Sequence, residues 1–174
     1  MGVDKASLEF EGRPLAARVL EALREVSAEV LVASGDGRRL AWLGARQVPD
    51  AIPQAGPLSA LVAGLERARQ PVTAVVAVDM PFASPAVLRL LADLVEEHDA
   101  AVPVTDAGLQ PLHAVYAAGA APLLRRQLDR GERSVRRALS ALSVREVRPE
   151  EWLPADPTGR FAGNLNLPED LPGG

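Results

Sequence analysis

Residues 78–82, VDMPF, carry the strongest chemical signal in this sequence. Asp79 follows an uninterrupted apolar run, and Pro81 keeps Met80 out of a helical conformation, so we expect the carboxylate to point out of the end of a buried strand. Such a lone carboxylate suits Mg2+, which proteins hold with one or two carboxylates together with water and substrate phosphates. The alternative is an aspartate that caps the next helix. Because Ser84 already fits that role, we favour the metal site.

A second carboxylate, Asp50, lies in a loop rich in Pro and Gly, VPDAIPQAGPL. Gly56 would allow a ligand to approach the backbone closely, and the helix that begins near Pro57 would offer free N–H groups to an anion. On the pattern alone, however, an aspartate in such a loop is more often a turn residue than a ligand.

Asn164 and Asn166 have i, i+2 spacing, which in extended backbone places both side chains on one side. An amide carbonyl is a hard oxygen donor, so either asparagine could complete a Mg2+ shell that Asp79 begins. A hydrogen-bonded turn before a short terminal helix is the alternative, and the spacing alone favours it.

Basic and titratable residues give weaker signals. Six arginines lie between positions 125 and 137, and Arg133, beside the Gly131 turn, could hold a phosphate as a bidentate fork. His113 could serve the acceptor side of a site, although a structural histidine is the commoner case. Lys5 is the one lysine against eighteen arginines, so its place near the first residues is more informative than that of an average lysine.

The elements that must position these residues follow from hydrophobic periodicity. Helical spacing of apolar residues predicts helices over 15–26, from Pro57 to about residue 69, and over 84–98. Apolar runs predict strands at 29–34 and 73–79, and because the second run does not alternate with polar residues we expect it in the centre of a sheet. Further strands are predicted at 100–106, 111–118 and 144–149, further helices at 121–131 and 134–142, and an irregular loop at 149–163.

This alternation of strands and helices predicts an α/β fold with three layers, Rossmann-like, in which helices cover both faces of a mostly parallel sheet. Ligands of such folds bind beyond the carboxyl ends of the strands, where Asp79 is expected. With 174 residues and no linker or repeat, the chain has the length of one domain, 1–174.

Composition excludes several classes of function. A net charge of −4 argues against general nucleic-acid binding, and no apolar run is long enough to span a membrane. The absence of cysteine excludes disulfides, zinc–thiolate sites and thiol catalysis. Because the N-terminus shows no signal-peptide pattern, we expect a cytoplasmic protein.

Five segments, taken in order, resemble the molybdenum cofactor guanylyltransferases, the MobA family. They are MGVDKA, PDAIPQAGPLSAL, VDMPF, QPLHAVY and NLNLPEDL, and together they extend over nearly the whole chain. The resemblance implies a nucleotidyltransferase fold and the Mg2+-dependent transfer of GMP from GTP to molybdopterin or molybdenum-molybdopterin, with release of pyrophosphate. Other proteins of molybdenum cofactor synthesis would be its partners.

The resemblance also implies roles for single residues. Lys5 matches the lysine that meets the nucleotide phosphates, and Asp79 matches the ligand of Mg2+ and GTP. The terminal asparagines match the family's paired terminal asparagines, Asn166 on the metal side and Asn164 on the acceptor side. The remaining matches to the GTP site are Gly2, Asp50, Gly56, Pro57 and Leu58.

The start of the chain departs from the family pattern. Family members begin with an apolar strand and a Gly-rich loop, and this chain starts at what would be the last Met and Gly of that loop. About fifteen residues, one strand and the loop, would therefore be missing. The runs at 30–33 and 74–78, which should flank the strand, would keep unpaired edges at a cost of several kcal/mol, so the chain as written should be unstable or inactive.

Two other readings stay open. A cytidylyltransferase or sugar-nucleotide transferase on the same fold would use a different substrate, and a degenerate domain without the phosphate loop would bind without catalysis. Codons for a strand and a Gly-rich loop in frame upstream of Met1 would favour the complete enzyme, whereas a stop codon would favour the degenerate domain.

Overall fold

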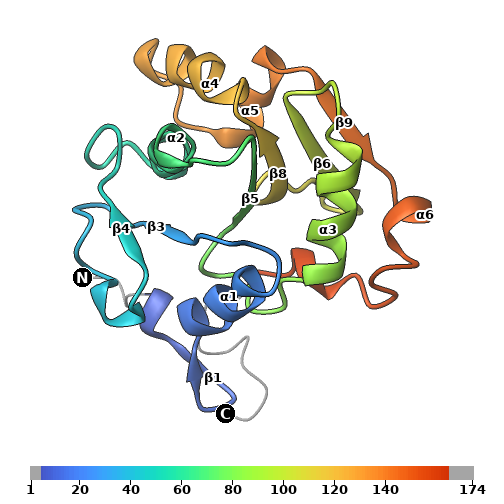
Figure 1. The fold of residues 1–174 in the computed structure, drawn as a ribbon, viewed down its shortest axis with the longest axis horizontal. Helices are drawn as coiled ribbons and strands as arrows, with labels where there is room; N and C mark the ends of the chain where they lie inside the picture. The colour runs from blue at the N-terminus through green and yellow to red at the C-terminus, as the bar shows by residue number, and fades with distance from the viewer. Residues whose placement is uncertain (1–4, 165–174) are drawn as a thin grey trace.

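A five-stranded sheet forms the centre of residues 5–164, the part of the chain that our computed structural model describes (Figure 1). The strands lie in the order β5-β8-β6-β7, and β9 pairs with β6. Their bounds are β5 (Val72–Val76), β6 (Ala100–Thr105), β7 (Gly108–Leu109), β8 (His113–Ala117) and β9 (Val144–Val147).

Strand β8 runs against the direction of its neighbours. It pairs antiparallel with both β5 and β6, whereas β6 and β9 pair parallel, so β5, β6 and β9 all point the same way. The chain between β6 and β8 holds only seven residues, which is too short for the crossover that a parallel pair needs. The predicted α/β fold is confirmed, with an antiparallel strand inside a sheet whose other long strands are parallel.

Two smaller sheets lie apart from this one. Strands β3 (Leu31–Ala33) and β4 (Arg46–Val48) pair parallel with each other, and β1 (Glu9–Phe10) and β2 (Arg13–Pro14) form an antiparallel pair. Neither β3 nor β4 pairs with β5, so β5 is an edge strand and not the central strand that its apolar run predicted. The run is partly exposed along its whole length because no described strand pairs with its outer edge.

Helices cover both faces of the large sheet, which gives three layers (Figure 1). Helices α2, α4 and α5 pack on one face, and α3 and α6 pack on the other. Within residues 5–164, no helix is both long and apolar enough to cross a bilayer. The helices are α1 (Leu15–Arg24), α2 (Pro57–Arg67), α3 (Pro85–Leu94), α4 (Ala120–Asp129), α5 (Val135–Ala138) and α6 (Pro149–Trp152), with the 3-10 turns η1 (Lys5–Ser7), η2 (Ala41–Leu43), η3 (Leu139–Ala141) and η4 (Arg160–Ala162).

Alternating side chains along the strands supply the two cores. On β6, Ala100 and Val102 face α2 and α4, and Ala101 faces α3. On β8, Tyr116 faces the first group of helices and Val115 faces the second, which is the two-residue period of a strand. Both faces of β6 and β8 are therefore buried, as the interior of a three-layer fold requires.

The segment 149–163 is more ordered than its sequence suggested. We predicted an irregular loop, but the segment contains α6 and η4 and sends two aromatic side chains into the core. Glu151 accepts a hydrogen bond from the backbone N–H of Arg148 at 2.9 Å, which closes the first turn of α6. Trp152 and Phe161 then pack with edge-to-face geometry, 5.1 Å between ring centroids.

Candidate active site

Asp79 lies in a tight turn just beyond β5. The strand ends at Val76, three residues earlier than predicted, and the N–H of Met80 donates to the carbonyl of Ala77 at 3.2 Å to form the turn. Met80 is buried and Asp79 is half-buried, so the apolar residue anchors the turn while the carboxylate stays within reach of solvent. Asp79 is therefore beyond the carboxyl end of β5, where a ligand is expected. Ser84 caps α3 as predicted, its hydroxyl accepting from the N–H of Val87 at 3.4 Å.

Asp50 joins the loop after β4 to the loop after β3. Its carboxylate accepts from the N–H of Gly35 at 3.1 Å, and its own N–H donates to the Gly35 carbonyl at 2.9 Å. Burial raises the pKa of the Asp50 carboxyl, and the hydrogen bond from Gly35 opposes that rise. This geometry matches the turn role that the pattern alone favoured. Sequence reasoning missed Gly35 as the hydrogen-bond partner of Asp50, although the GDG triplet at the end of the strand signalled a turn there.

Gly56 and Pro57 open α2 as the sequence predicted. Gly56 has φ +78°, a left-handed conformation that a side chain would strain, and a Cβ there would lie 3.8 Å from the carbonyl oxygen of Arg133. Leu58 is fully buried, which fixes the first turn of the helix to the core. The structure therefore brings the start of α2 next to Arg133.

A buried serine holds this loop in place. The Ser59 hydroxyl accepts from the N–H of Ile52 at 2.7 Å and donates to its carbonyl at 2.8 Å. Ser59 is fully buried, so both bonds are shielded from water. The segment between Asp50 and Gly56 is thus attached through Ile52 to the first turn of α2.

We expect Ser59→Ala to lower the free energy of unfolding by about 1–2 kcal/mol, because it leaves the N–H of Ile52 without its acceptor. The Ile52 carbonyl keeps the hydrogen bond from the N–H of Ala55 at 3.3 Å. Urea denaturation measures the change. Ser140→Ala is the matched control, since its hydroxyl bonds an exposed carbonyl on the surface. A loss no larger than that of the control would contradict the anchoring role.

The first described residues lie near the end of β5. Ala6, in the turn that Lys5 opens, is fully buried in an apolar cluster with Leu20 and Val32, and Val78 packs against the same cluster. Val78 is the neighbour of Asp79 in the chain. The backbone at residues 5–6 and the Asp79 turn therefore lie in one region of the molecule, which the predicted Lys5–Asp79 pair requires.

Near the C-terminus, residues 160–164 return to the Asp79 loop. The guanidinium of Arg160 lies over the ring of Phe82, 3.8 Å from its centroid, and Phe161 is fully buried. Asn164 follows and is exposed. Arg160 is a basic residue near the candidate site that sequence reasoning missed, because cation–π pairs leave no signal in the spacing. Gly2 and Asn166 lie outside the described residues.

His113 is an interior residue. It is fully buried, its Nε2 accepts from the backbone N–H of Ser84 at 3.1 Å, and its ring lies 4.7 Å from that of Phe161. It therefore fastens the start of α3 to β8. Because His113 is fully buried, it is poorly placed to contact an acceptor substrate, the functional role considered above. The structural role, which the sequence favoured, fits the geometry.

Burial lowers the pKa of His113 to about 4, below its ordinary 6.5. The unfolded chain therefore takes up a proton as the pH falls through 6.5, whereas the folded chain does not do so until about pH 4. We expect the free energy of unfolding to fall by about 3 kcal/mol between pH 7.5 and pH 4 from this group. His113→Gln should lose that part of the pH dependence, which urea denaturation across the range measures. Equal slopes for both proteins would contradict the prediction.

The basic stretch at 125–137 is largely occupied by contacts within the protein. The guanidinium of Arg133 donates to the carbonyls of Leu128 and Glu132, both at 2.9 Å, although its side chain is exposed. Arg137 pairs with Glu132, and Arg136 donates to the carbonyl of Leu109 at 2.9 Å. Arg133 is thus placed beside the start of α2 but is held by backbone groups.

The carboxylate of Asp79 suits a metal ion whose other ligands are water and the phosphates of a substrate. Residues 5–164 contain no cluster of three or more His, Asp or Glu side chains that could hold a metal by themselves. Asp79 supplies one carboxylate at a strand end, and this matches Mg2+, which keeps several waters and shares its shell with substrate phosphates. The residues therefore fit a divalent ion bound jointly with a nucleotide.

Comparison with known proteins gives one consistent result. Residues 1–145 match the family model of the MobA-like NTP transferase domain. A protein from Chloroflexus aggregans described as a probable molybdenum cofactor guanylyltransferase is 38% identical over an alignment of 176 positions, which covers 98% of this chain and 85% of that protein. This chain belongs to the MobA-like NTP transferase family.

Solved structures support the same placement for this MobA-like chain. The crystal structure of molybdopterin-guanine dinucleotide biosynthesis protein A from Archaeoglobus fulgidus has a TM-score of 0.83 and 27% identity, over 97% of this chain and 87% of that one. The 2-C-methyl-D-erythritol 4-phosphate cytidylyltransferase of Thermus thermophilus has a TM-score of 0.71 and 21% identity, over 95% and 89%, and shows the fold alone. The resemblance to the MobA family and the nucleotidyltransferase fold are therefore confirmed.

Proposed function

We propose that this MobA-like protein transfers GMP from GTP to molybdopterin or molybdenum-molybdopterin. The product would be the guanine dinucleotide form of the molybdenum cofactor, with release of pyrophosphate. The observation that carries the proposal is the position of Asp79, half-buried in the turn beyond β5, in a chain that is 38% identical to a relative described as a probable molybdenum cofactor guanylyltransferase. We treat residues 1–174 as one nucleotidyltransferase domain in the cytoplasm, with other proteins of cofactor synthesis as possible partners.

Asp79 and Lys5 are the residues that we assign to the reacting phosphates. The shared apolar cluster of Ala6 and Val78 supports this pairing, because it brings the neighbours of both residues together. Arg133 and Asn164 remain candidates for the acceptor side, since both side chains are exposed. The residues assigned to GTP are Gly2, Lys5, Asp50, Gly56, Pro57, Leu58 and Asp79.

Mg2+ is the metal that this donor set favours, and Asp79 and Asn166 are the residues that we assign to it. When bound with the nucleotide, the ion would neutralise charge on the α-phosphate and on the leaving pyrophosphate. The chain has a net charge of −4, so without local cations it would repel the anionic substrates.

The reaction itself needs little from a general base. A phosphate monoester oxygen of the acceptor, already anionic, forms a bond to the α-phosphorus of GTP while the bond to the β-phosphate oxygen breaks. One phosphoanhydride bond forms, one breaks, and pyrophosphate carries away the electron pair. The protein has to position two anions and neutralise them, which is the usual demand of phosphoryl transfer. The buried position of His113 is compatible with this mechanism.

Product analysis tests the proposal. The protein is incubated with GTP, Mg2+ and molybdopterin, and the dinucleotide product and pyrophosphate are measured by mass spectrometry and a coupled assay. We expect both products in equal amounts. Binding of GTP without any turnover would support a non-catalytic domain and overturn the proposal, and turnover with CTP in its place would assign the chain to the cytidylyl branch.

A further inference from the structure

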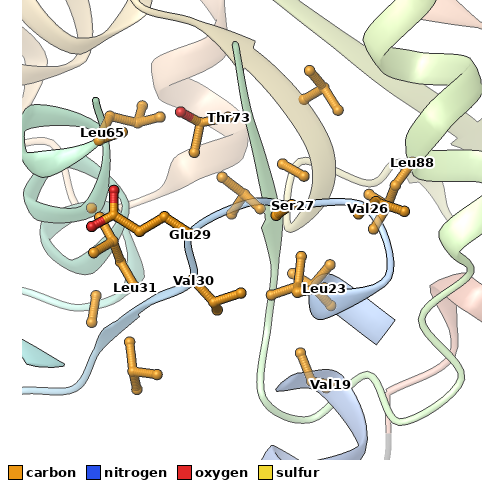
Figure 2. A pocket seen from close by; sticks show the side chains of 18 of the residues that line it. Val19, Leu23, Val26, Ser27, Glu29, Val30, Leu31, Leu65, Thr73 and Leu88 are labelled. Atoms are coloured by element: carbon orange, nitrogen blue, oxygen red, sulfur yellow. The ribbon is translucent and has the colours of Figure 1, made fainter. Parts of the chain in front are cut away.

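Strand β5, which precedes Asp79, has two different edges. One edge borders an apolar groove of about 660 Å3, and Figure 2 shows Leu23, Leu31 and Leu65, from α1, β3 and α2, around this groove. The other edge pairs with β8 along its whole length, and Val76, the last residue of β5, lies opposite His113. Within residues 5–164, β5 therefore takes its strand pairing from β8 alone.

Two adjacent residues on the β8 side hold both ends of the Asp79 loop, residues 77–84. At the start of the loop, the N–H of Ala77 donates to the carbonyl of Leu112 at 2.8 Å. At its end, the N–H of Ser84 donates to Nε2 of His113 at 3.1 Å. The two ends of the loop are thus fixed to neighbouring positions at the start of β8.

Between these two bonds, the loop makes two consecutive turns. The N–H of Met80 donates to the carbonyl of Ala77 at 3.2 Å, and the N–H of Ala83 donates to the carbonyl of Met80 at 3.1 Å. Met80 belongs to both turns, its side chain is buried, and Pro81 restricts its backbone. Because the turns share Met80, a shift at one end of the loop moves both of them. The place of the Asp79 carboxylate therefore depends on both ends.

The start of β8 is itself held firmly. The N–H of His113 donates to the carbonyl of Gln110 at 3.1 Å. The hydroxyl of Tyr116, which is fully buried, donates to the carbonyl of Pro111 at 2.7 Å. The ring of His113 packs against that of Phe161, with 4.7 Å between the centroids. His113 therefore has little freedom to move, and it can keep its hydrogen-bond partner in a fixed position.

The histidine side chain has a cost that an apolar residue would avoid. Burial lowers the pKa of His113 to about 4, so the ring is neutral at neutral pH, and because Nε2 accepts a hydrogen bond, the proton is on Nδ1. Nδ1 is buried, and no described residue accepts from it. A buried donor without an acceptor destabilises the folded state. Phenylalanine would fill the same space without this cost, so packing does not account for the histidine, whereas its bond with Ser84 does.

We propose that His113 is a positioning residue of the active site. By holding the N–H of Ser84, it fixes the far end of the Asp79 loop and so sets the place of the Asp79 carboxylate for a divalent ion bound with a nucleotide. His113 acts through Ser84 and touches neither the substrate nor the metal. This role rests on the proposed function, in which Asp79 is the assigned metal ligand.

Two variants of His113 test the role through the metal requirement. His113→Phe removes the acceptor and keeps a ring that packs against Phe161, whereas the amide oxygen of His113→Gln can still accept from Ser84. Calorimetry with GTP at a series of Mg2+ concentrations gives the concentration at which binding is half-maximal. We expect it to rise about tenfold in His113→Phe, the worth of roughly one hydrogen bond, and to stay within about twofold in His113→Gln. Saturating Mg2+ should restore the GTP affinity of His113→Phe.

Amide exchange followed by NMR reports on the loop itself, without nucleotide or metal. The amides of Met80 and Ala83 belong to its two turns. We expect them to exchange about tenfold faster in His113→Phe and at the original rate in His113→Gln. The amides of β8 should keep their rates in both variants, because the strand pairing does not involve the side chain of His113.

Leu124→Ala is the matched control for a loss of stability. Leu124 is fully buried on α4, on the face of the sheet opposite Phe161. Its truncation should lower the midpoint of thermal unfolding and leave both the Mg2+ requirement and the exchange of Met80 and Ala83 unchanged. If circular dichroism shows that His113→Phe does not fold, His113→Leu, which also lacks an acceptor, takes its place.

Three results would overturn the positioning role. Equal exchange of Met80 and Ala83 in the original protein and in His113→Phe would show that the bond to Ser84 does not fix the loop. Faster exchange with an unchanged Mg2+ requirement would show that metal binding does not depend on the bond. An equal rise in the Mg2+ requirement of Leu124→Ala would assign the effect to lost stability. If the original protein binds no GTP with Mg2+, the proposed function fails, and amide exchange still decides whether His113 holds the loop.

Discussion

Asp79→Asn is expected to weaken Mg2+-dependent binding of GTP by a hundredfold or more. The substitution keeps the size of the side chain but removes its negative charge. A divalent ion bound with nucleotide phosphates requires that charge. The turn that holds the residue depends on the backbone bond from Met80 and on the buried Met80 side chain, so it should persist in the variant. Isothermal titration calorimetry with GTP in the presence of Mg2+ measures the loss.

Asp93→Asn is the matched control for this measurement. Asp93 is an exposed carboxylate on α3, so its replacement changes the net charge equally without touching the Asp79 turn. We expect its affinity for GTP to stay within about twofold of the original protein. Unchanged affinity in Asp79→Asn, with the fold intact by circular dichroism, would remove Asp79 from the site.

Phe161→Ala is expected to have the largest effect on stability. Phe161 is fully buried and its ring packs against those of Trp152 and His113, at centroid distances of 5.1 and 4.7 Å. Truncating a buried phenylalanine leaves a cavity and costs about 3–5 kcal/mol. Urea denaturation at pH 7.5 measures the loss.

The control for Phe161→Ala is another aromatic residue. Trp42 is 51% exposed, so Trp42→Ala should change the free energy of unfolding by only about 0.5 kcal/mol. If both variants lost the same small amount, the segment at 160–164 would not be anchored through Phe161. Another contact, such as that of Arg160 with Phe82, would then have to hold residues 160–164 against the Asp79 loop.

Local signals in the sequence predicted most of the helices and strands. Apolar periodicity located α1, α2 and α3 within a few residues, and Ser84 and Pro85 marked the start of α3 correctly. These predictions succeed because each signal involves neighbouring residues. The position of a strand in its sheet depends instead on distant partners, so the edge position of β5 could not be predicted from its own composition.

The segment 149–163 shows a different limit. Helix α6 has only four residues, too few for periodicity to appear, although Pro149 at its start and Glu151 two residues later are ordinary signals of a helix N-terminus. The burial of Phe161 depends on Trp152 and on β8, which lie far apart in the chain. Similarly, the sequence suggested a possible functional His113, and only the bond from Ser84 shows its structural role.

Titration of GTP and of CTP, each with Mg2+, tests the central claim most directly, namely that Asp79 and its surroundings bind a guanine nucleotide through a divalent ion. Calorimetry reports both affinities. We expect GTP to bind at least tenfold more tightly than CTP, a difference of about 1.4 kcal/mol, and chelation of the metal to remove most of the binding. Tighter binding of CTP, or GTP binding that is unchanged by chelation, would contradict the account.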